Sequence, residues 1–91
     1  GTAVASGGVR PAQGGVAKVG RLAVKRVLGG GGGGRQLLQA LTDAARVRGD
    51  RELVLHAQRS AEGFYERLGW QRRGEPFVEA GVSHVEMVTP L

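Results

Sequence analysis

Six consecutive glycines, from Gly29 to Gly34, lie between an apolar segment and an amphipathic one, and they constrain the fold more than any other feature of the sequence. Glycines that connect a strand to the start of a helix leave backbone N–H groups free to bind an anion, and the helix dipole adds partial positive charge there. No side chain in such a loop obstructs a phosphate group. The run therefore predicts a phosphate-binding loop, with a flexible linker as the alternative.

The composition is that of a small soluble protein, and it excludes several kinds of chemistry. The 91 residues suffice for at most one small domain. The absence of cysteine excludes disulfides, zinc thiolates and thiol nucleophiles. Two histidines are too few for an all-histidine metal site, so we expect no metal. No apolar run approaches the ~20 residues of a membrane span, and no secretory signal opens the sequence. We therefore expect a cytoplasmic protein without a membrane partner.

The chain is basic, with a net charge of +5 from 13 Lys and Arg and 8 Asp and Glu residues. The basic residues are spread along the sequence and form no block of five or six. Such a distribution suits a diffuse positive field that attracts an anionic ligand, or an ordinary solvated surface. It argues against a nucleic-acid-binding tail, so we do not expect a nucleic-acid partner.

Apolar periodicity and turn residues predict strands and helices in alternation. The clearest element is a helix over Arg35–Arg48 that ends at Gly49. The other expected elements are a weak strand within residues 1–10, a loop over Pro11–Gly15, a strand over Val16–Val24, a strand over Glu52–Ala57, a short helix that Ser60 caps and Gly69 ends, a strand over Trp70–Gly74, a loop over Glu75–Gly81 and a strand over Val82–Val88. This order indicates an α/β layered domain.

Three motifs occur in one register. The first joins Arg21–Val24 (RLAV) to alternate glycines and then to Arg35–Leu38 (RQLL). The second is Ala61–Trp70, with the spacing A-x-x-F-Y-x-x-x-G-W. The third is Gly74–Met87, with the spacing G-x-x-F-x-E-x-G-V-x-H-x-x-M. Together they resemble the GNAT superfamily of acyl-CoA N-acyltransferases.

The resemblance implies a GNAT-like mixed, mostly antiparallel sheet with flanking helices. The family's domain opens with a strand and two helices that have no counterpart here. We therefore expect residues 1–91 to be a single GNAT-like domain that is incomplete at its N-terminus. The sequence departs from the family pattern at Gly29, where an Arg or Gln is usual, and at Gln58, where many members have Asn.

The resemblance also implies acetyl-CoA as co-substrate. Its pantetheine arm would run along the strand that contains Leu22, Ala23 and Val24, where a backbone N–H polarises the acyl carbonyl. Backbone N–H groups of the glycine loop would hold the pyrophosphate. The expected cofactor-binding residues are Leu22, Ala23, Val24, Gly29, Gly30, Gly31, Gly32, Gly33, Gly34, Arg35 and Gln58.

Tyr65 is the expected general acid for the leaving thiolate, because a phenol with a pKa of about 10 is protonated at neutral pH. His56 is the expected base, because the unperturbed pKa of imidazole lies near neutrality. His84 is expected to contact the acceptor, and Glu79 and Glu86 are alternative bases. The alternatives to these roles are an amphipathic core tyrosine and two structural histidines.

The sequence thus predicts an N-acetyltransferase that moves an acetyl group from acetyl-CoA to a primary amine by direct attack. The acceptor would be a small molecule or a peptide. The alternative is a truncated or degenerate GNAT-like module that binds CoA or dimerises without activity. We also expect a homodimer.

Overall fold

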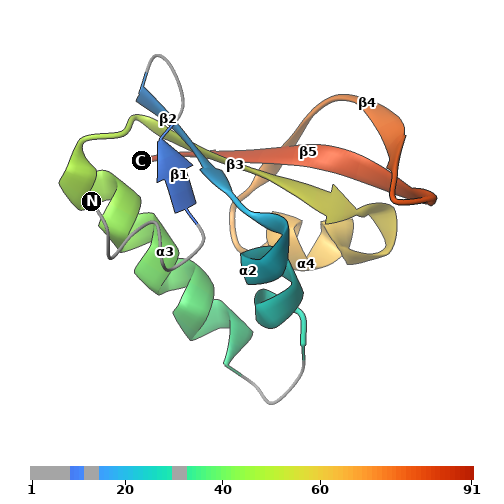
Figure 1. Cartoon of the computed structure of the whole chain (residues 1–91), viewed down its shortest axis with the longest axis horizontal. Coiled ribbons are helices and arrows are strands. Elements are labelled where there is room, and N and C mark those ends of the chain that lie inside the picture. The colour runs from blue at the N-terminus through green and yellow to red at the C-terminus, as the bar shows by residue number, and fades with distance from the viewer. Residues whose placement is uncertain (1–8, 12–14, 30–32) are drawn as a thin grey trace.

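The computed structural model describes residues 9–11, 15–29 and 33–91. Its strands form one sheet in the order β1-β2-β3-β5-β4 (Figure 1). Strands β2 and β3 are parallel, and the other neighbouring pairs are antiparallel, which confirms the predicted mixed, mostly antiparallel sheet. The elements are β1 (Val9–Pro11), β2 (Val16–Val19), α2 (Arg21–Val27), α3 (Gly34–Arg48), β3 (Glu52–Gln58), a 3₁₀ turn (Arg59–Ala61), α4 (Glu62–Arg67), β4 (Gln71–Glu79) and β5 (Val82–Pro90).

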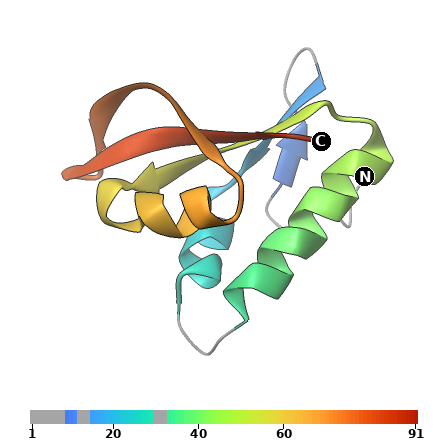
Figure 2. The same ribbon diagram turned by 180° about the vertical axis from the view of Figure 1, so that it is seen from behind.

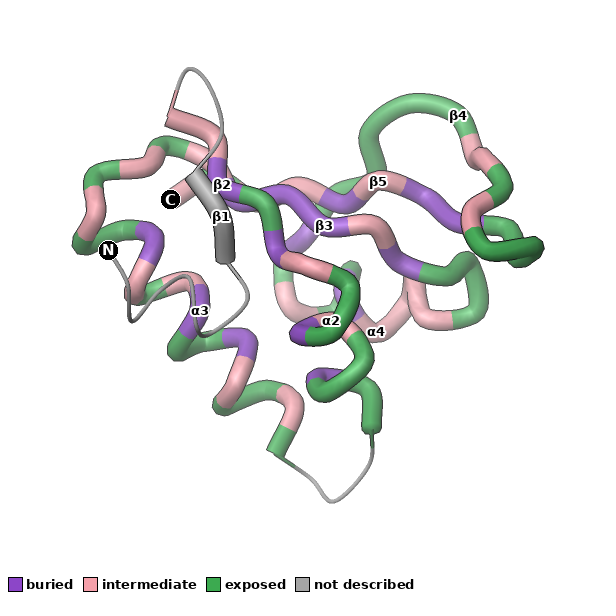
Figure 3. The backbone as a smooth tube through the Cα atoms, in the orientation of Figure 1, coloured by how far each residue is buried: buried purple, intermediate pink, exposed green. Residues whose placement is uncertain are grey.

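Helices α2, α3 and α4 of the described residues lie on the same side of the sheet, below it in both of the opposite views (Figures 1 and 2). Their apolar side chains pack against one face of the central strands. Figure 3 shows buried positions on α3 and along the central strands. The core residues are Ala17, Val19, Ala23, Val27, Leu38, Leu41, Ala45, Leu53, Leu55, Ala57, Tyr65, Trp70, Val85 and Met87.

Helix α3 confirms the clearest prediction from the sequence. Leu38, Leu41 and Ala45 recur at helical spacing and are buried against the sheet. Gly49 ends the helix in the left-handed conformation, with φ of 95°, as the sequence predicts. The helix thus begins at Gly34, the last glycine of the run.

The predicted strand over Val16–Val24 is wrong in its second half. Strand β2 ends at Val19, and Arg21–Val27 forms helix α2. Ala23 and Val27 lie four residues apart and are buried on one side of this helix, whereas Leu22 is 78% exposed. The segment is rich in Leu, Ala, Lys and Arg, which favour helices. The segment therefore forms a helix that buries Ala23 and Val27, in place of the strand that the sequence predicts.

The start of α4 also differs from the prediction. Arg59–Ala61 forms a 3₁₀ turn, and the helix begins at Glu62 with Ala61 at its N-cap and no side-chain cap. Ser60 lies inside the tighter turn and therefore does not cap the helix. Gly69, with φ of 94°, follows the helix as predicted.

The loop that the sequence predicts over Glu75–Gly81 is instead part of a hairpin. Strand β4 runs to Glu79, and a register shift between Arg73 and Phe77 accommodates the intervening residues. The chain reverses at Ala80 and Gly81, whose φ values of 54° and 75° suit a tight hairpin turn. The hairpin aligns the polar residues of β4 with those of β5.

Candidate active site

Strands β2 and β3 separate partway along the sheet. They pair only where Val16–Lys18 lies beside Glu52–Val54. Strand β3 continues to Gln58 and pairs with β5 along its whole length, while the chain after β2 turns into α2. Among the described residues, the second half of β3 thus has no strand partner on its β2 side. Its backbone N–H and C=O groups can bind an extended ligand there.

The described part of the glycine run joins α2 to α3. Gly29 follows α2, Gly33 is the N-cap of α3 and Gly34 is its first residue. Gly30, Gly31 and Gly32 lie outside the described residues. At this end of α3, the N–H of Leu37 donates to the carbonyl of the N-cap Gly33 at 3.0 Å. The earlier N–H groups of α3 therefore have no partner within the helix and suit a phosphate.

Gly34 has a steric role that its neighbour Gly33 does not share. A Cβ added to Gly34 would lie 2.1 Å from the carbonyl oxygen of Val27, a distance that real Cβ atoms do not show. A Cβ added to Gly33 would meet nothing within 4 Å. Glycine at position 34 therefore allows α3 to begin directly against the end of α2.

Tyr65 lies in the core between the helices and the sheet. It is fully buried, its ring contacts Phe64 and Trp70 edge-on, and its hydroxyl forms no hydrogen bond with any residue that the structure describes. Burial raises the pKa of Tyr65 to about 12, so the hydroxyl keeps its proton at neutral pH. An unsatisfied buried hydroxyl costs about 1–3 kcal/mol. A ligand atom that accepts its proton would remove this cost, which fits the predicted role as a donor.

His56 lies on the other face of the sheet. Its neighbours on β3, Leu55 and Ala57, are in the core, so strand alternation directs His56 away from it. Its Nδ1 lies 3.0 Å from Oε1 of Glu79, and its ring meets Phe77 edge-on at 4.9 Å. The structure therefore separates the two predicted catalytic residues, Tyr65 and His56, onto opposite faces.

Glu79 is the centre of a polar cluster on this second face. Its Oε2 lies 3.8 Å from Nε2 of His84 and 4.0 Å from Nε of Arg21. The hydrogen bond with His56 lowers the pKa of Glu79, and the nearby positive groups lower it further. Glu79 is thus an ionised acceptor. His84 is buried, and its Nδ1 donates to the carbonyl of Val82 at 2.7 Å.

Glu86 and Arg73 extend the cluster along β5 and β4. Oε1 of Glu86 lies 3.8 Å from Nε2 of His56, and its Oε2 accepts a hydrogen bond from Nε of Arg73 at 2.8 Å. Arg73 also donates through Nη1 to Glu52 at 2.8 Å, and both bonds raise its pKa. The sequence reasoning missed Arg73 and Glu52. Their polar positions could have been matched with His56 only if the strand register were known.

The other predicted residues are more dispersed. Gln58 is exposed at the end of β3, beside His84 in the β5 register. Leu22 is exposed and Ala23 is buried on α2, and the N–H of Val24 donates to the carbonyl of Gly20. That bond removes the N–H of Val24 as a donor to an acyl carbonyl. The structure thus joins His56 and His84 through Glu79, but it does not place Leu22–Val24 on a strand.

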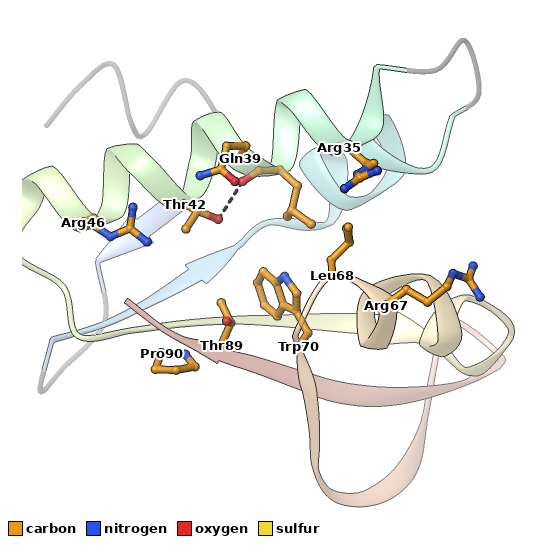
Figure 4. Close-up of a pocket in the computed structure, with 10 residues that line it drawn as sticks. Arg35, Gln39, Thr42, Arg46, Arg67, Leu68, Trp70, Thr89 and Pro90 are labelled. Carbon is orange, nitrogen blue, oxygen red and sulfur yellow. Dashed lines mark hydrogen bonds between the residues drawn. The ribbon is translucent and has the colours of Figure 1, made fainter.

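A cavity of about 380 Å³ opens on the helix side, between α3, α4 and the end of β5 (Figure 4). Its lining residues are Arg35, Leu38, Gln39, Thr42, Arg46, Arg67, Leu68, Trp70, Thr89 and Pro90. Three guanidinium groups make this lining positive, and only Arg35 was predicted as a site residue.

Within residues 9–11, 15–29 and 33–91, no group of three or more His, Asp or Glu residues is arranged to hold a metal ion. None of the helices described is long and apolar enough to cross a membrane.

The sequence matches the family described as the acetyltransferase (GNAT) domain over residues 3–91. The chain belongs to the GNAT acetyltransferase family. The match confirms the resemblance that the three motifs indicate.

Individual proteins are also similar to this chain. The chain is 32% identical over 75 residues to the uncharacterized protein YyaT of Bacillus subtilis, covering 82% of the chain and 51% of YyaT. A Lactobacillus plantarum structure, provisionally named an N-acetyltransferase, has a TM-score of 0.79 at 32% identity, over 91% of this chain and 57% of that one. An acyl-CoA N-acyltransferase of Pseudomonas aeruginosa has a TM-score of 0.66 at 30% identity, over 84% and 52%. The GNAT chain thus spans about half the length of these relatives.

Proposed function

We propose that this GNAT domain transfers an acetyl group from acetyl-CoA to a primary amine by direct attack. One arrangement supports the proposal: β2 separates from β3, and α3 begins nearby with Gly33 as its N-cap and Gly34 as its first residue. This arrangement offers an extended ligand an unpaired strand edge and offers its phosphates a helix N-terminus. Membership of the GNAT family makes an acyl-CoA the ligand that best fits both features.

The residues present fit acetyl-CoA in three respects. The N–H groups at Gly33, Gly34 and Arg35 would hold the pyrophosphate, together with the rest of the glycine run. The free edge of β3, from Leu55 to Gln58, would accompany the pantetheine arm. The unsatisfied hydroxyl of Tyr65 would donate to the thioester sulfur. The segment Leu22–Val24 stays a predicted part of this site, with a helical backbone in place of an extended one.

The proposed reaction uses one proton acceptor and one proton donor. The amine nitrogen of the acceptor attacks the thioester carbonyl, and the C–S bond breaks as the amide forms. His56 removes the proton that the amine nitrogen loses, and Tyr65 protonates the leaving thiolate. The hydroxyl of Tyr65 is protonated at neutral pH, so it has a proton to donate to the thiolate.

The acceptor would be a small molecule or a peptide with a primary amine. His84 would contact it, because this residue shares Glu79 with His56. The homodimer and the cytoplasmic location that the sequence suggests stay predictions.

Calorimetry and a thiol-release assay test this function on the chain itself. We expect heat on titration with CoA, and release of free thiol from acetyl-CoA in the presence of at least one member of a panel of primary amines. Absence of heat with acetyl-CoA would refute the cofactor assignment. Heat without thiol release for any amine would instead support the alternative function, a CoA-binding or dimerisation module without activity.

A single substitution localises the cofactor. We expect Gly32→Asp to weaken CoA binding at least tenfold, because it adds a carboxylate to the run that would hold the pyrophosphate. Val47→Asp is the matched control, since Val47 is 89% exposed near the other end of α3. It adds the same charge and should leave the affinity unchanged. Equal affinities of the two variants would place the pyrophosphate elsewhere.

A further inference from the structure

We infer that Glu79 positions His56, so that Nε2 of His56 and Oε1 of Glu86 together receive the acceptor amine. This inference rests on the proposed function. It assigns to Glu79 a positioning role in place of its alternative role as a base, and it assigns to Glu86 the binding of the acceptor nitrogen.

The first step concerns which imidazole nitrogen of His56 carries the proton. Nδ1 lies 3.0 Å from Oε1 of Glu79, within hydrogen-bond distance. An ionised carboxylate only accepts hydrogen bonds, so Nδ1 must be the donor. The lowered pKa of Glu79 supports its ionised state at neutral pH. The neutral imidazole is then the Nδ1–H tautomer, and the lone pair lies on Nε2.

The second step concerns Glu86, which is oriented by a different partner. Its Oε2 accepts from Nε of Arg73 at 2.8 Å, and its Oε1 is the oxygen nearest to Nε2 of His56, at 3.8 Å. Two acceptors at this distance do not bond to each other. A nitrogen with two N–H groups can donate to both, and a primary ammonium carries a charge that the carboxylate attracts.

The third step concerns whether an amine can reach His56 and Glu86, and which side chains surround these two residues. The side chains of His56 and Glu86 are 22% and 30% exposed, so a small amine can reach both. Phe77 lies between the two imidazoles, edge-on to His56 and stacked on His84. It provides an apolar wall beside the two acceptors. Oε2 of Glu79 also lies 4.0 Å from Nε of Arg21 at the start of α2 and 3.8 Å from Nε2 of His84 on β5.

Glu86, His56 and Glu79 account for the binding of the amine and for the protons that it loses. The ammonium binds Glu86 and loses one proton to solvent, and the neutral amine attacks the thioester carbonyl, whose C–S bond breaks as Tyr65 protonates the leaving thiolate. Nε2 takes the proton that the nitrogen loses as the amide forms. Glu79 then faces an imidazolium whose charge it stabilises.

Nitrogen NMR on the 15N-labelled chain tests the positioning role without reference to activity. We expect Nε2 of His56 to resonate as an unprotonated nitrogen and Nδ1 as a protonated one at a pH where the ring is neutral. In Glu79→Gln, the amide can donate to Nδ1, so the Nε2–H tautomer should become populated. A wild-type ring with Nε2–H would overturn the inference.

Steady-state kinetics test the same role in catalysis. Glu79→Gln should lower kcat by about 10²-fold, with CoA affinity in calorimetry unchanged. Glu86→Gln should instead raise KM for the amine at least tenfold and change kcat less, and Arg73 keeps Glu52 as a partner in that variant. Glu75→Gln, an exposed carboxylate on β4, is the control and should leave both constants unchanged.

The outcomes separate the two proposals. A wild-type chain that releases no thiol, yet shows the Nδ1–H tautomer that Glu79→Gln disturbs, would refute the proposed function and support the positioning of His56. Unchanged kcat in Glu79→Gln, together with an undisturbed tautomer, would refute the positioning role even in an active enzyme.

Discussion

Leu55 and His56 are neighbours on β3, yet they face opposite sides of the sheet and meet different surroundings. Leu55 is fully buried among apolar side chains under the helices. His56 is partly exposed and is held between Glu79 and Glu86. Strand alternation thus divides the domain into a face that stabilises the fold and a face that holds paired charges.

The two faces also differ in how their polar groups are satisfied. On the charged face, the clustered polar side chains have hydrogen-bond partners, such as Glu79 on His56 and Arg73 between Glu52 and Glu86. On the helix face, the hydroxyl of Tyr65 is buried and has no partner among the described residues. An unsatisfied group in an otherwise apolar core is the kind of local cost that functional sites retain. The comparison therefore points to Tyr65 as a functional residue on the stabilising face.

The largest expected effect comes from truncating the buried neighbour. Leu55→Ala should lower the free energy of unfolding by about 2–5 kcal/mol, because it leaves a cavity in the core. His56→Ala should lower it by about 1 kcal/mol, because it removes a partly exposed hydrogen bond and a ring contact. Urea unfolding of both variants measures the difference. Similar losses for the two would show that the charged face stabilises the fold as much as the core does.

A smaller effect, of opposite sign, is expected at Tyr65. Tyr65→Phe removes the unsatisfied hydroxyl and keeps the ring, so the free energy of unfolding should rise by about 1 kcal/mol. If Tyr65 is the general acid, acetyl transfer should fall by about 10²-fold in the same variant. Thermal unfolding and the thiol-release assay measure the two quantities. A variant that is less stable and equally active would make Tyr65 an ordinary core residue.

The parts of the fold that could be predicted from the sequence are those with local signals. Helix α3 has a local signal, because its apolar residues recur at helical spacing and Gly49 marks its end. Strand β3 has one as well, because Leu53, Val54 and Leu55 form a continuous apolar run. Helix α2 differs from the predicted strand because its motif, Arg21–Val24, is too short to show a period. The predicted strand over Trp70–Gly74 is shorter than β4, because the sheet accommodates the residues between Arg73 and Phe77 in a register shift.

The candidate site was predictable only as a set of separate residues. Tyr65 and His56 were named from their chemistry and from the family motif. Their placement on opposite faces, and the pairing of His56 with Glu79, depend on the long-range alignment of β3, β5 and β4. Local sequence carries no signal for that register, so the role of Arg73 could not be predicted either.

The smallest expected effect is a pH dependence that belongs to the charged face alone. The hydrogen bond with His56 holds the pKa of Glu79 below its ordinary value of 4.5. Glu79 thus stabilises the folded state above pH 4.5, and this contribution is lost as the pH falls through the lower, folded pKa.

Urea unfolding at about pH 6 and about pH 3 measures this contribution. We expect Glu79→Gln to lose less stability than the wild type between the two conditions, because glutamine has no carboxylate to protonate. Glu75→Gln keeps Glu79 and should follow the wild type. Equal losses in all three proteins would mean that the bond between His56 and Glu79 contributes nothing to stability, and that its function is confined to orienting the imidazole.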